Sequence, residues 1–271
     1  MTKFPLFFVN GKKRASYKIV KLPFDEDKLF IFESLRSYRG TIFRLEEHLD
    51  RLFESAKTSG LEIPKTRQIL KEELISSAKS FNERNVFLRL TLDEKNSYLL
   101  ILERNRPEWI YKKGIDLTTA VTRRNFVNSA PPEPKTNSFF NNVLGFMEKG
   151  SADIFECIFL DASGYVTEAA IWNIFMLKES TLFTPETGIL RGVTRQFVIE
   201  CAAKENLWLS ETNLTRHDFW NAHEAFLTNT SGEIVPIRSL DGRLIGTNIP
   251  GPITKRLTAR FHEELEKELR R

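Results

Sequence analysis

A proline-rich segment, Ser129-Ala130-Pro131-Pro132-Glu133-Pro134, interrupts the chain near its middle. Proline has no backbone N–H and restricts the residue before it, so this segment excludes a regular helix or a central strand. Strand-like and helix-like patterns occur on both sides of it. We therefore predict two domains, at residues 1–120 and 135–271, joined by a linker at residues 121–134.

The first block has the pattern of a sheet with two helices. Apolar runs predict strands at residues 6–9, 30–36, 86–92 and 98–102. Asn10 and Gly11 follow the first run and favour the positive φ angles of a hairpin turn. Apolar residues at helical spacing predict helices at residues 45–57, ending before Gly60, and at 66–80.

The second block repeats this mixture on a larger scale. Strands are predicted at residues 155–160, 165–168, 173–177, 182–183 and 225–228, and helices at 138–149, 193–206 and 253–269. Strands and helices grouped in two blocks favour a two-domain α+β protein with mixed sheets.

Charge and cysteine content exclude several classes of protein. The 40 basic and 36 acidic residues give a net charge of +4, and basic pairs such as Arg123-Arg124 are scattered, as on a solvated surface rather than a nucleic-acid-binding face. Cys157 and Cys201 form no CxxC pair and favour a reducing compartment. The histidines have no metal-ligand spacing, and the apolar runs are too short to cross a membrane. We expect a cytoplasmic protein that binds no metal, membrane or nucleic acid.

Common catalytic motifs are missing. The chain has no GxGxxG, GxxxxGK[ST], HExxH or GxSxG sequence. A dinucleotide-binding fold, a P-loop, a zinc hydrolase and a serine hydrolase therefore have no support in the sequence.

Two phrases in the second half carry a family resemblance. They are FLDASGYVTE at residues 159–168, followed by WNIF at 172–175, and TPETGILRGVTR at residues 184–195. Together with HLDRL at 48–52, PKTN at 134–137 and FLTNT at 226–230, they resemble the class IV aminotransferases, the pyridoxal-phosphate enzymes of fold type IV. That family includes branched-chain and D-amino acid aminotransferases and aminodeoxychorismate lyase. The resemblance covers nearly the whole chain and implies a small α/β domain, a larger mixed-sheet domain and a homodimer.

The resemblance implies roles in holding pyridoxal 5'-phosphate. Lys135 matches the lysine that forms an imine with the cofactor aldehyde and shuttles the α-proton. Glu168 matches the carboxylate that keeps the pyridine nitrogen protonated, since an opposite charge favours the charged form.

The phosphate group has its own set of matching residues. They are Arg51, Gly192, Val193, Thr194 and Thr230. The predicted helix that begins near Val193 offers free backbone N–H groups to an anion, and a guanidinium binds two phosphate oxygens at once.

The substrate side departs from the family pattern. Arg89 matches an arginine that would bind a substrate carboxylate, Arg36 is a second candidate, and Ser34 matches a hydroxyl position of the lyase members. Phe32 and Phe140 stand where relatives have tyrosines, and the usual Gly-Asp-Gly segment is absent. These departures leave open which group contacts the phenolic oxygen of the cofactor.

Three functions are compatible with these residues. The leading hypothesis is a transaminase that moves an amino group between a branched-chain or D-amino acid and a 2-oxo acid. The first alternative is an aminodeoxychorismate lyase that yields 4-aminobenzoate and pyruvate. The second is a degenerate member that binds a ligand without turnover, a reading that Lys135, Glu168 and Arg51 disfavour.

Overall fold

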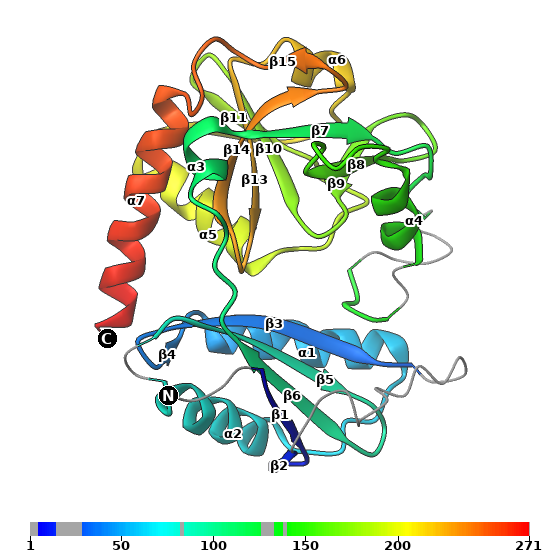
Figure 1. Cartoon of the computed structure of the whole chain (residues 1–271), viewed down its shortest axis with the longest axis vertical. Helices are drawn as coiled ribbons and strands as arrows, with labels where there is room; N and C mark the ends of the chain where they lie inside the picture. Colours follow the sequence, from blue (N-terminus) through cyan, green and yellow to red (C-terminus); the bar gives the residue numbers. More distant parts are fainter. Residues whose placement is uncertain (1–4, 15–28, 82–83, 126–132, 138–139, 271) are drawn as a thin grey trace. The chain divides into compact units, whose positions relative to one another are not determined.

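The computed structural model describes residues 5–14, 29–81, 84–125, 133–137 and 140–270. The chain divides into two compact units: unit 1 comprises Met1–Asn105, Pro134–Ser138 and Glu268–Arg271, and unit 2 comprises Arg106–Glu133 and Phe139–Lys267 (Figure 1). This division differs from the predicted one at both ends of the linker. Half of the predicted linker, residues 126–132, lies outside the described residues.

Unit 1 contains a six-stranded sheet in the order β2-β1-β6-β5-β3-β4. Its strands are β1 (Leu6–Val9), β2 (Lys12–Arg14), β3 (Ile31–Tyr38), β4 (Thr41–Ile42), β5 (Val86–Leu92) and β6 (Ser97–Leu102). All of its neighbouring strands are antiparallel, so a mixed sheet was a wrong prediction for this unit. The reason lies in the connections between the central strands. β5 and β6 are joined by a hairpin turn, and the chain returns from β4 to β5 through two helices, so that β5 runs antiparallel to β3.

Two helices, α1 (Leu45–Ser59) and α2 (Arg67–Lys79), pack against this sheet (Figure 1). Leu49 and Leu52 of α1 and Leu70 of α2 are at most 1% exposed and share one core with the odd-numbered side of β3. The predicted helices are confirmed. Gly60 ends α1 in the left-handed conformation that glycine adopts without strain, and the Thr66 side chain caps α2.

Unit 2 contains a larger sheet in the order β12-β11-β10-β13-β14-β7-β8-β9, with β15 beside β14. Its strands are β7 (Ile115–Thr119), β8 (Glu156–Leu160), β9 (Val166–Ala169), β10 (Asn173–Lys178), β11 (Thr181–Thr184), β12 (Trp208–Glu211), β13 (Glu224–Asn229), β14 (Glu233–Leu240) and β15 (Arg243–Leu244). The pairs β11/β12, β7/β14 and β7/β8 are parallel and the others are antiparallel. The mixed sheet predicted for the second block is therefore confirmed.

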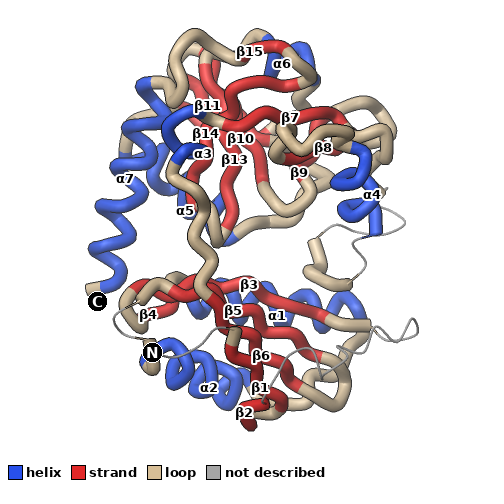
Figure 2. The backbone as a smooth tube through the Cα atoms, in the orientation of Figure 1, coloured by secondary structure: helices blue, strands red, loops and turns tan. Residues whose placement is uncertain are grey.

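Among the described residues of unit 2, the helices are α3 (Trp109–Lys113), α4 (Phe140–Glu148), α5 (Val193–Lys204), α6 (Arg216–Trp220) and α7 (Pro252–Leu269), and they lie around its sheet (Figure 2). The rings of Phe197 on α5 and Phe261 on α7 meet edge to face, with centroids 4.8 Å apart. In the described part of the chain, no helix is both long and apolar enough to span a bilayer.

The strands β7, β12, β14 and β15 of unit 2 were not predicted, and two of them lie inside the sheet. β14 carries Pro236, which normally argues against a central strand, yet Pro236 pairs with Phe226. β7 has only two fully buried residues, Ile115 and Leu117, and lies between β14 and β8. Because β7 belongs to this sheet, unit 2 begins before the predicted linker, at Arg106.

Candidate active site

Lys135 is held by its backbone against the sheet of unit 1. Its N–H donates to the Ser55 hydroxyl of α1 at 3.0 Å, and its carbonyl accepts from the N–H of Phe32 on β3 at 2.9 Å. Thr136 forms a β-bridge with Ile31. Residues 134–137 thus pair with the start of β3, which explains why Lys135 belongs to unit 1 and not to the second block.

Arg51 lies on α1 and forms a buried network with two residues that were not predicted as site residues. Its Nε and Nη2 donate to the two carboxylate oxygens of Glu33, each at 2.7 Å, and His48 Nδ1 lies 2.8 Å from the same carboxylate. Burial alone would raise the pKa of Glu33, but the charge and hydrogen bonds of Arg51 and His48 hold this pKa well below its usual range. Burial lowers the pKa of His48. Glu33 is therefore a carboxylate that fixes the Arg51 guanidinium.

A cationic face lies on the other side of the sheet. The guanidinium carbon of Arg89 is 3.9 Å from the centroid of the Phe32 ring, and Lys135 Nζ is 4.7 Å from the same centroid. Arg104 covers the ring of Phe87 at 5.0 Å. The pKa of Arg89 is lowered by burial and by the charge of Arg104. Three positive groups on one face of unit 1 would attract a carboxylate.

Ser34 and Arg36 lie on this same face, because alternate residues of a strand point to the same side. Ser34 pairs with Arg89 between β3 and β5, and Arg36 pairs with Phe87. The structure thus brings five of the predicted substrate and catalytic residues to one side of the unit 1 sheet: Phe32, Ser34, Arg36, Arg89 and Lys135.

Glu168 is the acceptor of a buried hydrogen-bond network in unit 2. One carboxylate oxygen accepts from Arg124 Nη2 at 2.5 Å, and the other accepts from Asn173 Nδ2 at 3.1 Å and from the N–H of Leu190 at 3.0 Å. Only 6% of the Glu168 side chain and 12% of the Arg124 side chain are exposed. The reading of Arg123-Arg124 as solvated surface was therefore wrong for Arg124, because its guanidinium is needed to neutralise a buried carboxylate.

The first turn of α5 begins beside this network. Gly192 precedes the helix without a side-chain cap, and Val193 and Thr194 are both buried. A Cβ at Gly192 would lie 2.2 Å from Asn173 Oδ1, so a side chain at this position would displace the Asn173 amide. Asn173 also donates to the carbonyl of Leu190 at 2.8 Å. The helix N-terminus, where backbone N–H groups lack partners, is thereby fixed relative to Glu168.

Thr230 directly follows β13 and is half-buried. β13 pairs with β10, so that Thr228 lies opposite Asn173. The next turn is tightened by Asn229, whose side-chain oxygen accepts from the N–H groups of Ser231 and Gly232. Thr230 thus stands on a rigid turn at the end of a central strand.

Five polar residues of these networks were not predicted: Glu33, His48, Arg104, Arg124 and Asn173. His48 and Asn173 stood within the motifs that carried the resemblance, and Glu33 directly follows the candidate residue Phe32, so these positions were a usable signal. Arg104 and Arg124 had no such signal, since each is close to a partner only through the fold.

The fold matches solved structures along almost its whole length. A branched-chain amino acid aminotransferase of Escherichia coli is 25% identical, with a TM-score of 0.87, covering 96% of this chain and 94% of that chain. A branched-chain amino acid aminotransferase of T.th., solved with pyridoxamine 5'-phosphate, is 27% identical with a TM-score of 0.87 over 98% of this chain and 95% of that chain. The architecture is thus that of the fold type IV enzymes.

Residues 30–240 match the family Amino-transferase class IV, and this chain belongs to that family. The branched-chain-amino-acid aminotransferase-like protein 1 of Arabidopsis thaliana is 36% identical over 244 residues, which are 84% of this chain and 44% of that protein. The present chain therefore spans less than half the length of that relative. A branched-chain-amino-acid aminotransferase of Pseudomonas aeruginosa is 32% identical, covering 86% of this chain and 83% of that protein. A D-alanine aminotransferase of Bacillus licheniformis is 27% identical, with 88% of both covered.

Proposed function

We propose that this protein is a pyridoxal-phosphate-dependent transaminase that moves an amino group between an amino acid and a 2-oxo acid. The observation that carries the proposal is the fixed backbone of Lys135, which is bonded on both sides to Ser55 and Phe32 in a member of the class IV aminotransferase family. A lysine held in this way presents its amine from a rigid support.

The polar residues around Glu168 and the glycine at the start of α5 suit this cofactor. When bound, pyridoxal phosphate supplies the electron sink for the negative charge at the α-carbon of the amino acid. Glu168 would keep the ring nitrogen protonated, and the carboxylate is oriented for this by Arg124 and Asn173. The glycine at 192, where a Cβ would meet the Asn173 amide, opens a helix start suited to a phosphate.

Lys135 and the phosphate residues would divide the remaining work. The Lys135 amine would attach the cofactor and then move the proton between the α-carbon and the cofactor carbon. Val193, Thr194 and Thr230 would bind phosphate oxygens through N–H and O–H groups. Glu33 accepts from Nε and Nη2 of Arg51 and so orients the guanidinium that would bind the phosphate.

The cationic face of unit 1 would select the substrate. Arg89 and Arg104 would bind a carboxylate of the amino acid or 2-oxo acid, and the rings of Phe32 and Phe87 would keep water away from it. The relatives include proteins named as branched-chain aminotransferases and one named as a D-alanine aminotransferase. We therefore propose aliphatic L-amino acids as the donors of this chain, with D-alanine as the competing donor.

A second copy of the chain would complete the enzyme as a homodimer. The helix α4 leaves Phe140, Val143, Phe146 and Met147 between 42% and 74% exposed. These side chains recur at helical spacing and form an apolar stripe, as expected for a surface that another subunit covers. The two cysteines, both free and buried, suit a reducing, cytoplasmic location.

The test is a single-turnover titration of the pyridoxal-phosphate-loaded protein, followed by visible absorption and by analysis of products. L-leucine, L-valine or L-isoleucine should bleach the band of the loaded protein and release the matching 2-oxo acid in an amount equal to the protein. Bleaching by D-alanine alone would move the donor to the D series. Release of pyruvate from aminodeoxychorismate without bleaching would instead establish the lyase, and no band at all would leave a protein without this chemistry.

A further inference from the structure

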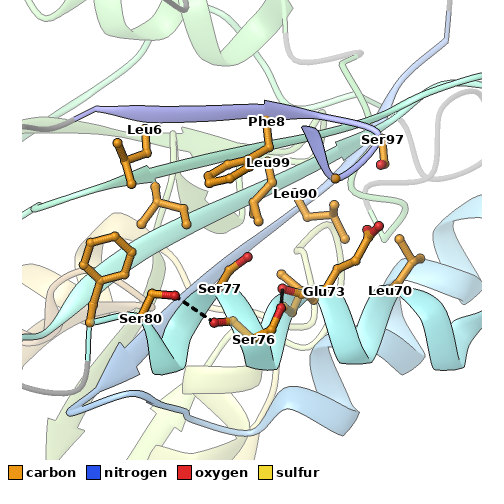
Figure 3. Close-up of a pocket in the computed structure, with 14 residues that line it drawn as sticks. Leu6, Phe8, Leu70, Glu73, Ser76, Ser77, Ser80, Leu90, Ser97 and Leu99 are labelled. Carbon is orange, nitrogen blue, oxygen red and sulfur yellow. Dashed lines mark hydrogen bonds between the residues drawn. The ribbon is translucent and has the colours of Figure 1, made fainter. Parts of the chain in front are cut away.

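A cavity of about 380 Å³ lies between α2 and the sheet of unit 1 (Figure 3). Its sheet wall consists of Leu6, Phe8, Leu90, Leu99 and Ile101, which come from three neighbouring strands. The strand register places these side chains next to one another in a continuous apolar surface. Protein interiors contain few gaps larger than a water molecule. This cavity instead has a volume within the range of about 300–1,000 Å³ that small-molecule sites occupy.

The cavity exists because α2 presents a small side chain where its pattern calls for a large one. Leu70, Leu74 and Phe81 line the cavity and are buried in the core of unit 1. Ser77 lies three residues after Leu74 and points toward the sheet wall in Figure 3. A leucine at position 77 would continue the apolar stripe of this helix. The serine leaves the space open and adds a hydroxyl to it.

The helix side of the cavity carries serine hydroxyls and one carboxylate, and no cationic side chain is among its described lining residues. Among the described residues that line it, Glu73 is the one ionisable group, and its carboxylate accepts from Lys65 Nζ at 2.6 and 2.8 Å. Ser76 donates to the carbonyl of Glu73 and Ser80 donates to the carbonyl of Ser76, each at 3.1 Å. These donor hydrogens are used within the helix, which leaves the hydroxyl oxygens to accept.

We propose that this cavity binds a small amphiphile with an aliphatic body and a neutral hydroxyl or amide head. The body would pack on the apolar wall, and the O–H or N–H of the head would donate to the serine oxygens. An anionic head would meet the Glu73 carboxylate, because the Lys65 ammonium that pairs with this carboxylate is not part of the described lining.

The proposed site is distinct from the one that Lys135 serves. Leu90 of β5 contributes to the cavity wall, whereas its neighbour Arg89 covers Phe32 on the opposite face of the sheet. Binding in the cavity therefore requires neither the cofactor nor the proposed transamination. The two proposals stand or fail separately.

Hexan-1-ol is a suitable probe, and hexanoate is its anionic counterpart of equal chain length. We would measure the dissociation constants of both by ligand-observed NMR with the full chain, the cavity-filling variant Ser77→Leu and the control Lys79→Leu. Lys79 lies on the same helix, is exposed and is not part of the cavity lining. We expect hexan-1-ol to bind the wild type and Lys79→Leu equally and to bind Ser77→Leu at least about tenfold more weakly.

Hexanoate should bind the wild type at least about tenfold more weakly than hexan-1-ol. Ser77→Val serves as a milder filling variant if Ser77→Leu does not fold. The proposal is overturned if hexan-1-ol does not bind the wild type, if the filled variant binds it equally well, or if hexanoate binds as tightly. A retained absorption band and transaminase activity in Ser77→Leu would show that only the cavity was changed.

Discussion

Arg51 and Glu33 form a two-point ion pair inside unit 1, with both N–O distances at 2.7 Å. The Glu33 side chain is 1% exposed and that of Arg51 is 11% exposed. A buried carboxylate that loses its partner is costly, so this pair holds the guanidinium in one orientation. Glu33 is thus a positioning residue for the arginine that we propose as a phosphate ligand.

Glu33→Gln should destabilise the protein by about 3–5 kcal/mol, because Arg51 and His48 then share no charged partner. It should also weaken the binding of pyridoxal phosphate. The matched control is Glu46→Gln, since Glu46 pairs with Arg67 and Lys71 at the surface, and its loss should cost at most about 1 kcal/mol. Denaturant unfolding and cofactor titration measure the two effects.

The pH dependence of the same variant gives an independent check. Because the folded-state pKa of Glu33 is below its ordinary value of 4.5, its contribution to stability is present above pH 4.5 and is lost as the pH falls. The wild type should therefore lose stability more steeply than Glu33→Gln in acid. Parallel curves for the two proteins would contradict the role of this ion pair.

Arg124→Leu should lower transaminase turnover by roughly ten- to a hundredfold, because Glu168 loses the cation that orients it. The band of the loaded protein should also shift, since in the proposed site this carboxylate would keep the ring nitrogen protonated. Arg123→Leu is the control, because Arg123 is exposed. Equal turnover in the two variants would contradict the proposed role of Arg124 in orienting Glu168.

Glu156→Gln should stabilise the protein at neutral to alkaline pH. Burial raises the pKa of Glu156 to about 7, so the folded protein keeps a proton that the unfolded chain releases. Wild-type stability therefore falls as the pH rises from 4.5 to about 7, by up to about 3 kcal/mol, and is then constant. The glutamine keeps an oxygen to accept from the N–H of Cys157. The free energy of unfolding of Glu156→Gln should therefore not fall with pH over this range as that of the wild type does.

Met147→Glu should convert the proposed homodimer to monomers in sedimentation experiments, because it places a charge in the apolar stripe of α4. Trp208→Glu is a control of similar exposure on β12, at 76% against 74% for Met147. Dissociation by the tryptophan variant and not by the methionine variant would place the dimer contact elsewhere.

Local patterns predicted most of the elements. β5 and the start of α5 follow directly from an alternating run and from a glycine before an apolar helix. β14 has no clear strand pattern because it carries Pro236, which argues against a central strand, although Pro236 pairs with Phe226 inside the sheet. The sequence pattern could not predict that Lys135 belongs to unit 1, because this depends on hydrogen bonds to Ser55 and Phe32, which are distant in the chain.

The site was predictable in its motif residues and not in their partners. Lys135, Glu168 and Gly192 stand in the phrases that carry the resemblance. Arg124 lies 44 residues from Glu168, and only the fold of unit 2 brings the two together. Spacing along the chain carries no information about such a pair.

We propose that Lys135 bears the cofactor, and peptide mapping after reduction is the direct test of this role. The protein would be loaded with pyridoxal phosphate, reduced with borohydride, digested and analysed by mass spectrometry. We predict a phosphopyridoxyl group on the peptide that contains Lys135, and no such group on that peptide when L-leucine is added before reduction. Label on another lysine, or no label on any peptide, would contradict the proposed role of Lys135.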